Sequence, residues 1–169
     1  MCNTLSGLIK DCLTNLGSIK RLWFLKPDEL NTITITNLEI TSMSLVTGTT
    51  LIEYQVKPNS SNYDVNQAID DLGVNEYTTS VSISINRRSA EKNLEFENLS
   101  QGNPDWYLIV EDGNGLYWFL GYEYGLNVKS ISGGSGQNKA QGSTYNISLT
   151  GLNKYPDLEI ESSVILSLI

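Results

Sequence analysis

An alternation of apolar and polar residues recurs along most of this chain and restricts it to a β-rich fold. Val81, Ile83 and Ile85 alternate with polar residues, and the same period of two is seen through Tyr145–Thr150. Successive side chains of a strand point to opposite faces of a sheet, so this period predicts strands with one buried and one solvated face. Further strands are predicted at Ile19–Leu25, Thr32–Ile40, Thr50–Val56, Trp106–Glu111, Leu116–Tyr122, Leu126–Ile131, Leu158–Ile160 and Val164–Leu168. Short strands in this number predict an all-β, mainly antiparallel sandwich or barrel.

The segment Tyr107–Gly121 predicts a tight hairpin that is apolar on both faces. Asp112-Gly113 and Asn114-Gly115 supply the positive φ angles that a tight turn requires. A sheet with one solvated face alternates apolar with polar residues, so we expect both faces of this hairpin to be covered, either by the predicted helix or by a neighbouring copy. The second strand places Leu116, Trp118, Leu120 and Tyr122 on one face and Tyr117 and Phe119 on the other.

One short helix and two long connections interrupt the strands. Ser89 can cap a helix over Ala90–Leu99, whose apolar residues fall near one face. A polar stretch at 57–76 is longer than an ordinary connection, and Val65–Leu72 within it could form one or two helical turns. The Ser/Gly-rich run at 131–143 predicts a flexible loop.

The phase of the apolar residues slips by one position within Thr32–Ile40. Because a one-residue slip turns every side chain to the other face, a bulge or break is predicted near Thr36–Asn37. The expected organisation is an N-terminal arm over residues 1–17 and one domain over 18–169, with extended loops at 57–76 and 131–143.

Composition excludes several classes of function. The chain has 169 residues, no histidine, and 19 acidic against 11 basic residues, for a net charge of −8. Without histidine there is no Ser-His-Asp or Cys-His catalytic system and no histidine-bearing metal site. An acidic chain also lacks the cationic excess that neutralises phosphates, so specific DNA binding is not expected. We expect no enzymatic activity, metal or cofactor.

The N-terminal residues carry the two cysteines, Cys2 and Cys12. One pair is too sparse for a disulfide framework, so free thiols in a reducing compartment are expected. Met1–Ile9 does not have the pattern of a signal peptide, and no apolar run approaches the length of a membrane span.

Motifs that could carry chemistry have simpler interpretations. Asp112 and Asn114 resemble part of a calcium loop, but the spacing fits a hairpin turn better. The glycines at 133–136 lack the residues that complete a phosphate-binding loop. Glu111 and Glu123 are the best candidates for a pair of glycosidase carboxylates, which we rank last.

Aromatic residues and an arginine pair are candidates for binding surfaces. Arg87 and Arg88 follow a predicted strand, where they are solvated or contact an acidic neighbouring subunit. The aromatic residues could stack on sugars, although aromatic residues in strands more often form a core or an interface between subunits. This candidate platform consists of Trp106, Tyr107, Tyr117, Trp118, Tyr122 and Tyr124.

The order of these features resembles small virion proteins of tailed phages and prophages of Bacteroides-type hosts. The shared features are Gly17–Phe24 after Asp11-Cys12, the helix, the hairpin Ile109–Gly121, the Ser/Gly-rich loop and the strand Ser143–Gly151 before Tyr155-Pro156. The end of the chain is similar to tail-tube-like proteins. The resemblance implies a β-sandwich or barrel that assembles into rings or a stacked tube around a DNA channel, without catalytic residues.

The sequence thus leads to the expectation of a non-enzymatic virion protein, assembled in the bacterial cytoplasm as a ring or tube of six- or twelve-fold symmetry. Its partners would be its own copies and the neighbouring tail or neck proteins, with DNA passing through without specific binding and without contact with a membrane. Tube, connector ring, tail completion and head decoration all remain open, and a β-sandwich module that binds carbohydrate or a host surface is the alternative. The expected interface residues are Tyr117, Trp118, Phe119, Tyr122, Leu5, Leu8, Leu16, Arg87 and Arg88.

Overall fold

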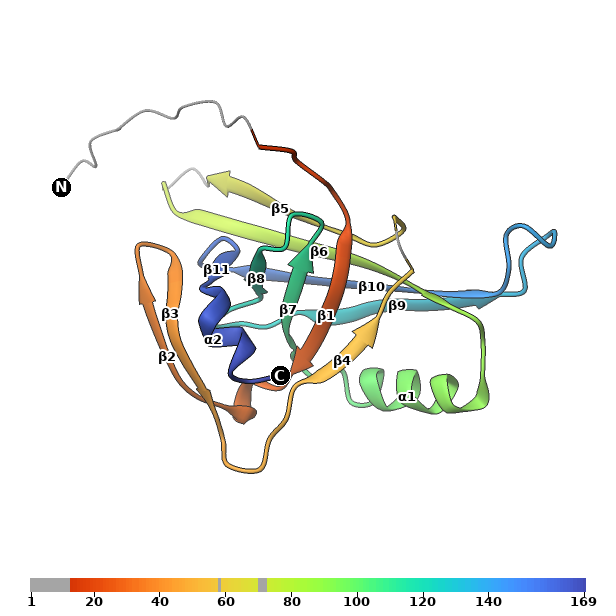
Figure 1. The fold of residues 1–169 in the computed structure, drawn as a ribbon, viewed down its shortest axis with the longest axis horizontal. Helices are drawn as coiled ribbons and strands as arrows, with labels where there is room; N and C mark the ends of the chain where they lie inside the picture. The colour runs from red at the N-terminus through yellow and green to blue at the C-terminus, as the bar shows by residue number, and fades with distance from the viewer. Residues whose placement is uncertain (1–12, 58, 70–72) are drawn as a thin grey trace.

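The structure, a computed structural model, describes residues 13–57, 59–69 and 73–169 and is mainly β (Figure 1). Two sheets of mostly antiparallel strands pack together, which confirms the predicted all-β sandwich. Two short α-helices and a 3₁₀ turn accompany the sheets. The strands are β1 (Ile19–Leu25), β2 (Leu30–Thr36), β3 (Glu39–Leu45), β4 (Ile52–Gln55), β5 (Asn62–Ile69), β6 (Asn75–Asn86), β7 (Tyr107–Asp112), β8 (Tyr117–Leu120), β9 (Asn127–Gly134), β10 (Thr144–Asn153) and β11 (Leu158–Ile160). The helices are α1 (Ala90–Ser100) and α2 (Ser162–Leu166), and the 3₁₀ turn is η1 (Pro27–Glu29).

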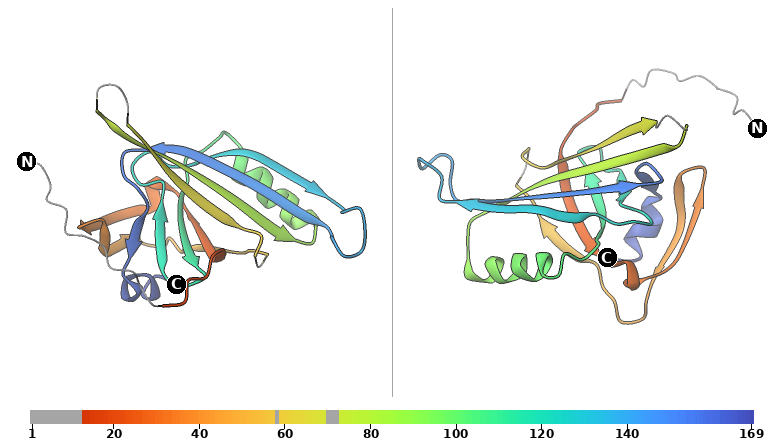
Figure 2. Two further views of the ribbon diagram at one scale, coloured as in Figure 1. Left: turned by 90° about the horizontal axis from the view of Figure 1, so that it is seen from above. Right: turned by 180° about the vertical axis from the view of Figure 1, so that it is seen from behind.

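The larger sheet has the order β2-β3-β11-β8-β7-β1-β4, and the smaller has the order β5-β6-β10-β9. The β11–β3 pair is parallel, and the other pairs between these strands are antiparallel. Seen from above, the long strands of the smaller sheet lie across those of the larger one (Figure 2, left). The β9–β10 hairpin extends well beyond the body of the sandwich (Figures 1 and 2).

The main core lies between the two sheets. Alternate residues of β6 and β10 point inward, as their period of two predicts, and meet alternate residues of β1 and β7. Phe96 and Leu99 of α1 join the same core, and the Trp106 indole N–H donates to the Leu99 carbonyl oxygen at 3.0 Å. This core buries Leu22, Phe24, Val81, Ile83, Leu108, Val110, Tyr145, Ile147 and Leu149.

A second core covers the other face of the larger sheet. Val164 and Ile165 of α2 pack there with residues of β3 and β11. Tyr117 and Phe119 of β8 lie in this core, and Phe119 is fully buried. The predicted two-sided hairpin is therefore covered by the chain itself. The covering elements are α2 and the β2–β3 hairpin, and not the helix α1 or a neighbouring copy.

Backbone hydrogen bonds connect the two sheets along both sides of the sandwich. On one side the Ile19 N–H donates to the Ser61 carbonyl, and the Lys57 N–H donates to the Ser84 carbonyl. On the other side Trp106 and Leu126 exchange a pair of backbone hydrogen bonds. These hydrogen bonds fix the position of one sheet relative to the other, while β2, β4, β5 and β9 remain the edge strands.

The phase slip in Thr32–Ile40 predicted a bulge or break near Thr36–Asn37, and the structure has a break there. β2 ends at Thr36, and the chain reverses into β3. Asn37 and Leu38 both have positive φ and link β2 to β3 as a two-residue turn, which allows Thr36 to face Glu39. Val65–Leu72 is not helical over its described residues, because β5 runs through Ile69, and the expected loop at 57–76 is mostly strand.

Near the C-terminus, Val164–Leu168 was predicted as a strand, whereas α2 begins at Ser162. Val164, Ile165 and Leu168 contact the second core with helical spacing. The Ser/Gly-rich loop is shorter than expected, since β9 continues to Gly134. The helix prediction was correct: α1 begins at Ala90, and the Ser89 hydroxyl oxygen accepts the Lys92 N–H.

Candidate functional site

The carboxylates considered for glycosidase chemistry lie at opposite ends of β7. Glu111 is buried and accepts hydrogen bonds from Lys20 Nζ at 2.7 Å and Arg21 Nε at 2.6 Å. Burial alone would raise the pKa of Glu111, but these two cations outweigh it and lower the pKa. Glu123 lies near Tyr107 at the other end of the strand. The two carboxylates therefore do not face one cleft.

The candidate aromatic platform is divided between different surfaces. Trp106 faces the main core, and Tyr107 and Tyr117 lie in the second core. Trp118 is partly buried, and its indole N–H donates to Asp112 Oδ2 at 3.1 Å. Tyr124 is the most exposed of the set. No shared stacking surface results from this arrangement.

The other expected interface residues fall into three groups. Tyr117 and Phe119 are buried in this chain's own core, so they do not present a surface to a neighbour, while Tyr122 is partly buried. Arg87 and Arg88 are exposed between β6 and α1, and the Arg88 guanidinium lies 5.2 Å from the Tyr145 ring centre. Leu16 is exposed, and the predictions for Leu5 and Leu8 lie outside the described residues.

The β7–β8 turn holds the segment 13–18 against the sandwich. Asp112 Oδ1 accepts the backbone N–H groups of Asn114 and Leu116, which closes the turn. Asn114 Oδ1 accepts the Leu16 N–H at 2.6 Å, and the Gly113 N–H donates to the Ser18 carbonyl. The turn oxygens are thus used within the chain, as the hairpin interpretation predicted. Among the described residues, no group of three His, Cys, Asp or Glu side chains could hold a metal ion.

Gly113 explains how the segment 13–18 approaches the turn so closely. A Cβ atom at this position would lie 2.6 Å from the Gly17 carbonyl oxygen and 2.8 Å from that of Leu16. Such contacts are shorter than any real Cβ contact, so only glycine permits this packing. The chain is therefore held against the turn at Gly17 and Ser18, where the sequence predicts the boundary between the arm and the domain.

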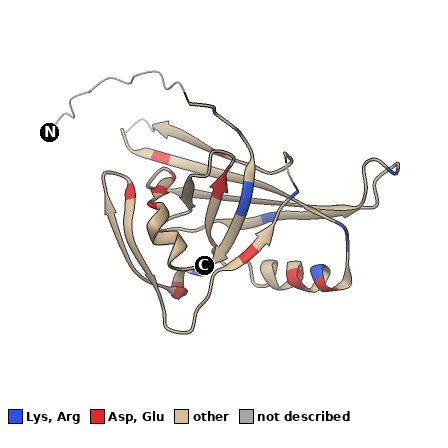
Figure 3. Ribbon diagram, viewed as in Figure 1, with Lys and Arg blue, Asp and Glu red and all other residues tan. Residues whose placement is uncertain are grey.

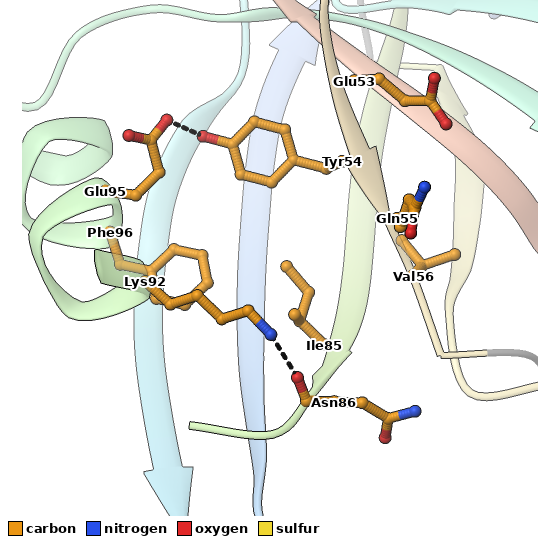
Figure 4. Close-up of a pocket in the computed structure, with 9 residues that line it drawn as sticks. All are labelled: Glu53, Tyr54, Gln55, Val56, Ile85, Asn86, Lys92, Glu95 and Phe96. Atoms are coloured by element: carbon orange, nitrogen blue, oxygen red, sulfur yellow. Dashed lines mark hydrogen bonds between the residues drawn. The ribbon is translucent and has the colours of Figure 1, made fainter. Parts of the chain in front are cut away.

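A groove runs between the edge strand β4 and the helix α1. It consists of a pocket of about 380 Å³ and a pocket of about 420 Å³ that share Tyr54 and Glu95, and we call the two together the side groove. The Tyr54 hydroxyl donates to Glu95 Oε1 at 2.6 Å and bridges β4 to α1 (Figure 4). Burial and the nearby Glu95 carboxylate raise the pKa of Tyr54.

The walls of the side groove combine apolar and charged groups. Phe96 and Ile85 line the first pocket, and Phe24, Leu99 and Trp106 line the second. The charged residues at the groove are Lys26, Glu29, Glu53, Lys92 and Glu95. Such a groove can accommodate apolar side chains and satisfy a polar backbone at its rim. Sequence reasoning missed the groove because its two walls are far apart in the chain.

No protein-family model matches this chain, and no curated protein is similar to it at a significant level. Within the part of the chain that the structure describes, no helix is both long and apolar enough to cross a membrane.

Proposed function

We propose that this chain is a non-enzymatic structural protein of a tailed-phage virion that assembles with copies of itself into a ring or tube of the tail or neck. The observation that carries the proposal is the β9–β10 hairpin, which extends beyond the sandwich (Figures 1 and 2). Every residue from Ser132 to Gly142 is exposed, so this end of the hairpin contributes no side chain to a core. A long paired extension without a core of its own is suited to contacts with a neighbouring subunit.

The outer face of the smaller sheet is compatible with DNA passing nearby. One row of residues across its four strands reads Asn62, Ser82, Ser148 and Ser130. In the next row Asn146 and Ser132 are exposed, whereas Ser84 is buried. These neutral side chains offer no ionic attraction to phosphates, so DNA would not be retained there.

The distribution of charge supports contacts between copies more than binding of a polyanion. Basic and acidic residues are interspersed over the ribbon (Figure 3), and Lys20 and Arg21 of β1 both form ion pairs with Glu111 of β7. Arg87 and Arg88 are exposed and form no ion pair among the described residues, so they are free to meet an acidic neighbour. With a net charge of −8, the surface of each copy offers many such acids.

The proposal is tested by light scattering after size exclusion, on the full chain and on a variant with a shortened hairpin. Replacing residues 135–142 by Asn-Gly leaves a three-residue connection with Ser143, whose carbonyl still accepts the Arg87 N–H. We expect a multimer for the full chain and at least a tenfold weaker association for the variant, at unchanged thermal stability. A monomer at every concentration would reject spontaneous assembly and would favour the binding module.

A further inference from the structure

The side groove adjoins a pocket that the segment 13–18 helps to line. A neighbouring pocket of about 330 Å³ shares Val56 with the groove and is lined by Leu16, Gly17 and Ser18. The segment 13–18 crosses this surface without helix or strand hydrogen bonding of its own. The segment 13–18 thus forms one wall of a pocket that adjoins the side groove, and among the described residues only the Tyr54–Glu95 hydrogen bond crosses the groove itself.

The side groove offers the edge of a strand as well as an apolar floor. Among the described strands, β4 pairs with β1 alone, so its other edge presents backbone N–H and C=O groups that no strand satisfies. Helix α1 faces this edge across the groove (Figure 4). An extended peptide could pair with β4 through its backbone and insert alternate side chains into the two pockets.

Residues 1–12 fit this position in a second copy. They precede the segment 13–18, which leaves β1 at the end away from α1 (Figure 1). Asn15 Oδ1 accepts a hydrogen bond from Asn114 Nδ2 at 3.1 Å, so the first described residues lie at the β7–β8 turn and do not line the side groove. Twelve extended residues span up to about 40 Å, which is enough to reach a neighbouring molecule.

We propose that the side groove of one copy binds residues 1–12 of another copy as an extended strand added to β4. In an extended chain Leu5 and Ile9 lie on the same face about 13 Å apart, so both can enter the groove. Lys10 would lie on the opposite face of the added strand, the face on which β4 carries Glu53 and not Tyr54. The proposal rests on the proposed self-assembly and identifies one contact within it.

Cross-linking through the natural cysteines tests this contact directly. Cys2 and Cys12 both lie in the segment that would enter the groove, and they are the two cysteines of the chain. A tagged acceptor chain carries Cys2→Ser, Cys12→Ser and Asn98→Cys, which places one thiol at the groove. It is mixed with the unmodified chain under a mild oxidant, and the disulfide-linked heterodimer is measured on non-reducing gels.

The matched control carries Glu97→Cys in place of Asn98→Cys. Glu97 is an equally exposed neighbour on α1 that does not line the groove. We expect the heterodimer to form at least tenfold faster with Asn98→Cys than with the control. Adding Ile52→Glu to the acceptor should reduce this rate at least tenfold, because Ile52 is half exposed and lines the groove.

The outcomes separate this proposal from the proposed function. Multimers by light scattering with equal cross-linking at both positions would overturn the groove contact and leave self-assembly standing. A disulfide that forms only within one chain, in the Asn98→Cys variant with its natural cysteines, would also overturn it, since the arm would then occupy its own groove. A chain that is monomeric and forms no heterodimer would overturn both.

Discussion

Helix α2 gives the sharpest test of how the second face of the β7–β8 hairpin is covered. Ile165 is 0% exposed and packs in the second core with Phe119, whereas the adjacent Leu166 is 61% exposed. Ile165→Ala removes side-chain volume from this core without harming the helix, because alanine has the highest helix propensity. The substitution therefore reports on packing alone.

The expected loss follows from complete burial. Replacement of a buried isoleucine by alanine costs about 2–5 kcal/mol, and a fully buried site between a helix and a sheet should fall near about 3 kcal/mol. For a chain of this length, each kcal/mol lowers Tm by about 2–4 °C, so a decrease of about 6–12 °C is expected. Urea unfolding followed by tryptophan fluorescence measures the free energy of unfolding, and calorimetry measures Tm.

The matched control is Leu166→Ala, which should change stability by less than about 0.5 kcal/mol. Equal effects of the two substitutions, or a loss below about 0.5 kcal/mol for Ile165→Ala, would refute the reasoning. In that case α2 would not cover Tyr117 and Phe119, and these side chains would again be available to a neighbouring copy as the sequence suggested.

Two further predictions concern the ion pairs and the arm. Glu111→Gln should lower the free energy of unfolding by about 1–2 kcal/mol at pH 7, a value reduced because Lys20 and Arg21 are partly exposed. Because the folded-state pKa of Glu111 is lowered from 4.5, its contribution is present above that value and is lost as pH falls below it, so the difference between variant and wild type in urea unfolding should shrink towards pH 3. Asn114→Ala removes the acceptor of the Leu16 N–H and should speed proteolytic cleavage within residues 13–17 several-fold at unchanged Tm. Cleavage at the wild-type rate would show that this hydrogen bond does not hold the arm.

The two-residue period of apolar side chains was sufficient to predict most strands of the two sheets. β1 and β11 have the predicted bounds, and β6 and β10 include their predicted cores. In these strands the buried face is apolar at almost every second residue, so the pattern and the tertiary structure agree. The α1 prediction succeeded for a similar reason, since Ser89 supplies a local cap.

Errors occurred where a local pattern was compatible with two structures. In β5 the partly buried Tyr63 and Val65 alternate with exposed residues, but Ala68 and Ile69 also fit a helical turn. The backbone pairing with β6 makes the segment a strand. Asn37 and Leu38 form a turn that requires positive φ at both positions. Leucine rarely adopts this conformation, so the predicted break was not recognisable as a turn between two strands.

The candidate site was less predictable than the fold because its walls come from segments that are far apart in the sequence and meet only in the tertiary structure. Tyr54 and Glu95 lie 41 residues apart, and neither belongs to a motif. The sequence predicted an N-terminal arm, but not where it contacts the domain. That contact depends on Gly113 and Asn114, for which the sequence indicated only a role in the hairpin turn. The pattern of residues in one sequence does not indicate which loop packs against which strand edge.

The central claim is that this chain assembles with itself around a channel. Negative-stain electron microscopy of the purified full chain, imaged at several concentrations and again after addition of mild crowding agents, tests it most directly. The account predicts rings or stacked tubes with a central opening and a constant number of subunits. Uniform particles of a single 18.7 kDa chain under every condition would contradict it.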